Sequence, residues 1–186
     1  MLLLHSGLSL PKNQKHNFQI PNPMSKLLDR FIPLIYIQIS PEKLTLKNIK
    51  SGEVISEVPE LAIAYEKNAH IVGTGNEAVF HRSKPSVKII NPFAHPRTLV
   101  SDFTVAEQLL KAMVNRLLGS SIFAVSPKIV LHPLGDPAGG FTQVELRAFR
   151  EMAYGAGASQ VVVWTGRTLT DLELSSGNFP NDGQVD

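Results

Sequence analysis

Residues 127–164, PKIVLHPLGDPAGGFTQVELRAFREMAYGAGASQVVVW, decide the fold. Lys128–His132 is a short apolar run with β-branched residues between two prolines, which predicts a buried strand. Thr142 and Glu145 have the spacing of a capping box, so a helix should begin there and end at the glycines before residue 158. Residues 161–164 predict a second buried strand. A strand, a helix and a returning strand normally place the two strands parallel in one sheet, with the helix on its face.

The chain before this unit predicts further strands and one long helix. Residues 34–39 and 43–49 should form a hairpin. Short strands, which we expect to be antiparallel and meander-like, are predicted at 54–58, 61–65 and 69–73, with another at 87–90 and a helical turn at 77–81. Thr104 and Glu107 match a second capping box, and apolar residues at helical spacing run from there to Gly119.

Length and composition narrow the class of protein. The chain has 186 residues, is 43% hydrophobic and carries a formal net charge of +2 with no basic cluster. It can therefore bury a sizeable core in one domain, and a nucleic-acid partner is not indicated. The chain has no cysteine, which rules out disulfides and cysteine-bound zinc and fits a cytoplasmic location.

Composition also divides the chain into three parts. We expect residues 1–23 to be a disordered leader, 24–170 to be the folded domain and 171–186 to be a flexible tail. Either Met1 or Met24 could start the native protein. The segment Met24 to Ile32 has apolar residues on one helical face and bases elsewhere, which is typical of a peripheral membrane contact or of packing on the protein's own sheet. We favour packing for so short a segment.

An ordered series of motifs resembles the bacterial actin homologues of the MreB family. The series includes Val72-Gly-Thr-Gly-Asn-Glu-Ala78, Ile90-Asn-Pro-Phe93, Val100-Ser-Asp-Phe-Thr-Val-Ala-Glu107 and Thr142-Gln-Val-Glu-Leu-Arg-Ala148. It runs in register from about Met24 to Trp164 and covers only the N-terminal half of an MreB. The resemblance implies an α/β fold of the ribonuclease-H-like, actin-like ATPase type, a mixed sheet with helices packed on it.

The chain departs from this family where the resemblance places nucleotide chemistry. In the family, the first hairpin turn carries an Asp that orders magnesium and a Gly and Thr that approach the phosphates. The matching positions here are Gln38, Ser40 and Pro41. Gln has no charge for a cation and Pro has no N–H to donate, so this phosphate loop is expected to be degenerate and binding there doubtful.

A second departure follows the last strand of the half. The family's Glu-Glu-Pro, which helps to position the attacking water, is replaced by Thr165, Gly166 and Arg167. We therefore name no catalytic residue, no metal ligand and no cofactor, and lean towards a chain that is not an enzyme. ATP and magnesium belong only to the alternative given below. A ribonuclease-H-like nuclease is also disfavoured, because its metals need a carboxylate where Gln38 stands.

Other candidate sites are weaker. Asp136-Pro-Ala-Gly-Gly140 precedes a helix N-terminus and could hold an anion, although an ordinary crossover loop explains it better. The six histidines lack the spacing of metal ligands, and surface or satisfied core positions explain them better.

Two functional hypotheses remain. The first is a cytoplasmic MreB-like scaffold or interaction protein connected with bacterial cell shape, without ATP hydrolysis. It would self-associate or bind another actin-like or cell-shape protein, in the cytoplasm or peripherally at the inner membrane. The second is an actin-like ATPase fragment that retains weak ATP binding. For the scaffold, an actin-like half without its second lobe should expose apolar area that a partner covers.

Overall fold

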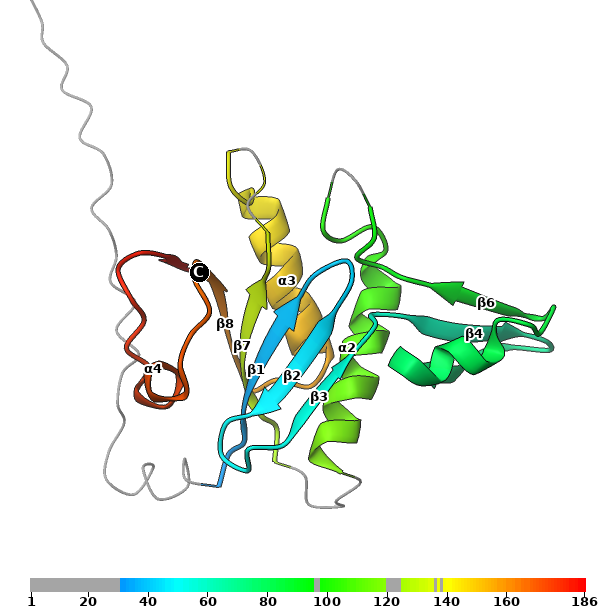
Figure 1. Cartoon of the computed structure of the whole chain (residues 1–186), viewed down its shortest axis with the longest axis horizontal. Coiled ribbons are helices and arrows are strands. Elements are labelled where there is room, and N and C mark those ends of the chain that lie inside the picture. Colours follow the sequence, from blue (N-terminus) through cyan, green and yellow to red (C-terminus); the bar gives the residue numbers. More distant parts are fainter. Residues whose placement is uncertain (1–30, 96–97, 120–124, 136, 138) are drawn as a thin grey trace, which may run out of the picture.

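Two sheets and the helix α2 between them build the molecule (Figure 1). The computed structural model describes residues 31–95, 98–119, 125–135, 137 and 139–186. The six-stranded sheet has the order β3-β2-β1-β7-β8-β9. Its strands are β1 (Leu34–Ile39), β2 (Leu44–Asn48), β3 (Val54–Glu57), β7 (Lys128–Pro133), β8 (Gln160–Thr165) and β9 (Gln184–Val185).

The six-stranded sheet is mixed. β1, β2 and β3 are successively antiparallel, while β7 runs parallel to both β1 and β8. β9 closes the sheet antiparallel to β8. The strand, helix and strand expected within residues 127–164 are confirmed, and so is the hairpin of residues 34–49.

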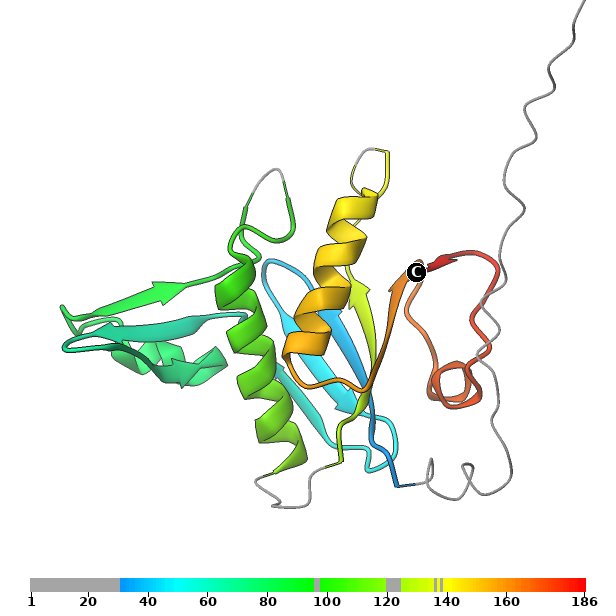
Figure 2. The ribbon, with the colours of Figure 1, turned by 180° about the vertical axis from the view of Figure 1, so that it is seen from behind.

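Two helices cover one face of this sheet, α2 (Phe103–Leu118) and α3 (Gln143–Gly155), which lie side by side in Figure 2. Strand alternation explains the packing, because Ile35, Ile37 and Ile39 point to this face and join the main core. Leu109 and Phe149 pack into the same core from the helices. The stripe of apolar residues in α2 is therefore core, as its spacing predicts.

The small sheet extends from the far side of α2 (Figure 1). It has the order β5-β4-β6 and consists of β4 (Leu61–Tyr65), β5 (Ala69–Thr74) and β6 (Val87–Ile90). The 3₁₀ helix η1 (Gly75–His81) connects β5 to β6. Glu57 of β3 connects α2 with η1 of the small sheet. Its carboxylate pairs with Arg116 of α2 at 2.7 Å and accepts the N–H of Asn76 of η1 at 3.0 Å. The sequence predicted these strands but not their division between two sheets.

The last part of the chain covers the other face of the six-stranded sheet. The helix α4 (Asp171–Ser176) and Phe179 pack there against Trp164, Tyr36 and Val130. Phe179 stacks on Trp164 with ring centroids 5.7 Å apart. The chain's own C-terminal residues therefore bury part of the apolar surface that a partner was expected to cover.

Several expectations need correction or lie outside the structure. The helix α2 does not begin with the expected box of Thr104 and Glu107. Asp102 is its N-cap, because the Asp102 carboxylate accepts the N–H of Val105 at 3.0 Å. No secondary structure was expected after residue 170, yet residues 171–186 contain α4 and β9. The leader of residues 1–23 and nearly all of the amphipathic segment, Met24 to Arg30, lie outside the described residues, and the expected domain limits stay predictions.

Candidate functional site

The carboxyl ends of β1, β7 and β8 meet at one edge of the sheet, because these strands are parallel. Ligands of open α/β sheets bind at such edges. The sequence-predicted positions gather here: Gln38 lies near the end of β1, and Thr165 ends β8. His132, near the end of β7, pairs with Gln38 across the sheet and was not predicted to belong to this region.

The turn after β1 hydrogen-bonds to itself. The backbone N–H of Ser40 donates to the carbonyl of Lys43 at 2.9 Å. The N–H groups of Glu42 and Lys43 donate to the Ser40 hydroxyl oxygen at 3.3 and 3.0 Å. Pro41 has no N–H, and its carbonyl accepts the side-chain amide of Asn91 at 2.8 Å. The donors that a phosphate would need from this turn are thus engaged within the protein.

Gln38 contacts the loop that follows β8. Its side-chain amide donates to the hydroxyl oxygen of Thr168 at 3.4 Å. An uncharged amide is a weak partner for magnesium, whereas a carboxylate would supply the charge that hard cations prefer. Gln38 therefore offers no charge to a cation at this edge of the sheet.

Tyr36, His132 and the loop form a buried hydrogen-bonded chain beside Gln38. The Tyr36 hydroxyl lies 2.5 Å from Nδ1 of His132, and Nε2 of His132 lies 2.9 Å from the carbonyl oxygen of Gly166. The backbone N–H of Leu169 donates to the Tyr36 hydroxyl at 3.2 Å. A neutral ring with its proton on Nε2 satisfies all three contacts, with the Tyr36 hydroxyl donating to Nδ1.

Burial shifts the pKa values of Tyr36 and His132 in the directions that favour their neutral forms, which these hydrogen bonds require. Burial raises the pKa of Tyr36, against the smaller opposing effect of the Leu169 N–H. Burial lowers the pKa of His132, and the hydrogen bond to Gly166 opposes that shift. A neutral His132 and a neutral Tyr36 hold the loop on the sheet.

Arg167, in the loop after β8, is a cation whose charge is paired with nearby carboxylates. Its guanidinium pairs with Glu173 at 2.5 Å and with Asp182 at 3.2 Å. Arg167 and the Thr170 cap together hold the pKa of Glu173 down to about 2. Glu173 and Thr170 form a capping box at the start of α4, so the loop is fixed at both ends.

The remaining candidates are a metal site and the loop before α3. Among the described residues, no group of three or more His, Cys, Asp or Glu side chains could hold a metal ion. Thr142 and Glu145 form the expected capping box of α3. In the preceding loop, Asp136 and Ala138 lie outside the described residues, and the N–H of Gly140 donates to the carbonyl of Pro137 at 2.7 Å.

Sequence reasoning found Gln38, Ser40, Pro41 and the replacement at residues 165–167. It missed Tyr36 and His132, whose pairing depends on strand register. A Tyr and a His on the same face of two apolar strands were the only signal in the sequence, and without the parallel register of β1 and β7 they could not be paired.

Comparison with known proteins agrees with this fold. Residues 44–170 match a family model described as MreB/Mbl protein. The cell shape-determining protein MreB of Pasteurella multocida is 31% identical over 115 residues, which are 59% of this chain and 31% of that protein. MreB of Escherichia coli is 31% identical over 116 residues, with the same coverage of 59% and 31%. The chain thus spans about a third of the length of these curated relatives.

Solved structures show the same fold. MreB5 of Spiroplasma citri bound to ADP has a TM-score of 0.56 at 18% identity, covering 72% of this chain and 38% of that one. A non-polymerising mutant of MamK bound to AMPPNP has a TM-score of 0.57 at 14% identity, covering 71% and 40%. The expected α/β fold of the ribonuclease-H-like, actin-like ATPase type is confirmed. In the part of the chain that the structure describes, no helix is long and apolar enough to span a membrane.

Proposed function

Because the chain belongs to the MreB/Mbl family, we propose that it acts as an actin-fold scaffold or interaction protein connected with bacterial cell shape, without hydrolysing ATP. The family is shown for residues 44–170, and the curated relatives are cell shape-determining proteins. Their whole-protein activity comes to this chain only as part of the proposal, because the chain spans about a third of their length.

The main support for this proposal is the turn after β1, whose N–H groups donate hydrogen bonds within the turn itself. A phosphate-binding turn offers several backbone N–H groups to the ligand at once. Here the N–H groups of Glu42 and Lys43 are donated to Ser40, and Pro41 has none to give. A nucleotide would have to break these bonds before it gained its own, and Gln38 would bring no charge to its magnesium.

The loop of residues 166–170 supports the same proposal. It lies over Tyr36 and His132 through the hydrogen bonds of Gly166 and Leu169. Two side-chain pairs of Arg167 hold it in place. The chain itself thus holds this loop beside the edge of the sheet where a nucleotide would enter.

The proposed partners are a second copy or another actin-like or cell-shape protein. Large apolar side chains are exposed on the small sheet and η1, among them Tyr65 at 54% and Phe80 at 79%. Exposed apolar groups that gather on one lobe commonly mark an interface. We place this function in the cytoplasm, and a peripheral contact of Met24 to Ile32 with the inner membrane is part of the proposal.

The alternative function is an actin-like fragment that binds ATP weakly. One observation favours it: the solved structures with the same fold are complexes with ADP and AMPPNP. The two functions differ in what the carboxyl ends of β1, β7 and β8 can bind.

Isothermal titration calorimetry of the full chain with Mg-ATP separates the two functions. The scaffold predicts no heat of binding at millimolar ATP, and micromolar binding would refute it. If binding is found, Gln38→Ala and Ser40→Ala test whether it occurs at this edge of the sheet, with Ser86→Ala on the small sheet as a control.

Light scattering of the same sample gives the state of association. The scaffold predicts dimers or larger assemblies whose size does not change with ATP. Replacing Phe80 by Ser should reduce their size, whereas Val144→Ser, which alters an equally exposed apolar residue on α3, serves as a control. A monomer at all concentrations would contradict self-association.

A further inference from the structure

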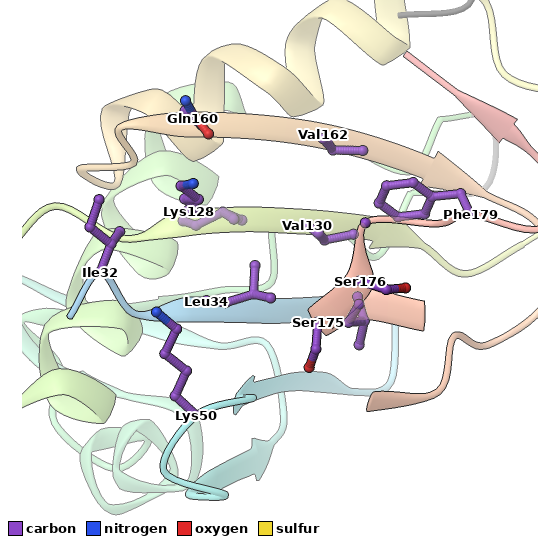
Figure 3. A pocket seen from close by; sticks show the side chains of 13 residues that line it. Ile32, Leu34, Lys50, Lys128, Val130, Gln160, Val162, Ser175, Ser176 and Phe179 are labelled. Atoms are coloured by element: carbon purple, nitrogen blue, oxygen red, sulfur yellow. The ribbon is translucent and has the colours of Figure 1, made fainter. Parts of the chain in front are cut away.

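A groove of about 200 Å³ opens at the opposite edge of the sheet from the candidate functional site (Figure 3). Its floor is formed by the first residues of β1, β7 and β8, and its wall by the end of α4 and by Phe179. The floor and wall are apolar, with Leu34, Val130, Val162 and Leu174 among the lining residues. The groove is thus an apolar surface on the face of the sheet that α4 and Phe179 cover in part.

The chain enters the domain at the mouth of this groove. Ile32 itself lines the groove, and Phe31 before it is 72% exposed. The preceding segment, Met24 to Arg30, therefore starts at the rim. Leu28 lies four residues before Ile32 in the sequence, so the chain between them spans at most about 14 Å. That distance places Leu28, and Leu27 beside it, within reach of the groove.

The size of the groove suits this segment. A closed apolar cavity of about 150 Å³ takes up a benzene molecule, so the groove has room for branched aliphatic side chains. Lys50 and Lys128 stand on either side of Ile32 at the rim (Figure 3).

We propose that the groove is the docking site of the chain's own segment Met24 to Arg30, with Leu27 and Leu28 as the side chains that enter it. The segment then covers apolar surface of β1, β7 and β8. The docked leucines are the residues that a membrane contact would use, so the docked and the membrane-bound states exclude each other. This inference does not depend on whether the candidate functional site binds ATP.

Disulfide trapping in the full chain tests the docking, because the natural chain has no cysteine. The test variant carries Leu28→Cys and Ser176→Cys, since Ser176 lines the groove and is exposed. One control moves the first cysteine to the opposite helical face, as Lys26→Cys with Ser176→Cys. The other pairs Leu28→Cys with Ser86→Cys, beside the small sheet. Diamide is added to dilute protein, and mass spectrometry follows the intramolecular disulfide.

The docking predicts that the Leu28 and Ser176 pair closes at least tenfold faster than either control. Equal rates in all three variants would overturn it. Covalent dimers through Leu28→Cys and Ser176→Cys would also overturn it and would assign the groove to a second copy. A groove-filling change, Val162→Phe in the test variant, should slow closure towards the control rate, and unchanged closure would count against the groove as the site.

Discussion

Tyr36→Phe removes a single hydroxyl group but should lower the free energy of unfolding far more than the loss of so small a group suggests. Tyr36 is 4% exposed, and its hydroxyl joins β1 to β7 through His132 and to the loop of residues 166–170 through Leu169. Phenylalanine keeps the ring and its packing. The change therefore isolates the two hydrogen bonds.

The expected size follows from the groups left behind. Without the hydroxyl, Nδ1 of His132 and the N–H of Leu169 lose their partners, and both residues are buried. An unsatisfied buried group costs about 1–3 kcal/mol. The two groups together predict a loss of about 2–6 kcal/mol in the free energy of unfolding.

Urea unfolding measures this loss, and the chain carries its own probe. Trp164 is the single tryptophan and is fully buried beside the loop, so its fluorescence reports unfolding. Tyr65→Phe is the matched control, because Tyr65 is 54% exposed and should change the free energy of unfolding by less than about 0.5 kcal/mol. A loss no greater than that of the control would refute the role given to the Tyr36 hydroxyl.

Three further outcomes are expected. Burial holds the pKa of His132 in the folded protein below its ordinary value of 6.5, so the unfolded chain takes up the proton first as the pH falls. The contribution of His132 to the free energy of unfolding should therefore be full above about pH 6.5 and decrease as the pH is lowered. His132→Gln should reduce this pH dependence in urea unfolding. In Gly183→Ala the new Cβ would lie 2.2 Å from the Trp164 ring, which should cost about 1–3 kcal/mol and change the tryptophan emission spectrum; an unchanged spectrum would contradict the close contact. Gln38→Asp alone should not create Mg-ATP binding in calorimetry, because the turn at Ser40 and the loop at Thr168 remain; clear binding by this variant would show that the charge alone was missing.

Local patterns predicted the elements of the fold well. Apolar periodicity, turn residues and the capping box at Thr142 predicted β1 to β8 and the two long helices nearly to the residue. The N-cap of α2 was misplaced because Asp102, two residues before Thr104, is an equally good cap, and only the backbone geometry decides between them. Such competing caps are a limit of local sequence patterns.

Long-range arrangement was less predictable. The division of strands between two sheets depends on the partners that β3 and β4 choose, which no local pattern records. The polar segment 171–186 showed no hydrophobic period, yet Leu174 and Phe179 suffice to hold it on Trp164. At the candidate functional site, Gln38 and Pro41 could be found by comparing sequence motifs, while the pair of Tyr36 and His132 could be found only from the strand register.

The pairing of β1 with β7 also has a consequence for how the chain folds. Tyr36 and His132, which are neighbours in these strands, are 96 positions apart in the sequence. The intervening chain includes the small sheet and α2, so the central pair closes only after a long loop has been ordered. Sheets with such non-local pairing fold slowly. During synthesis, the apolar strand β1 stays unpaired with β7 until most of the domain has been made. We therefore expect aggregation to begin at β1 when folding is delayed.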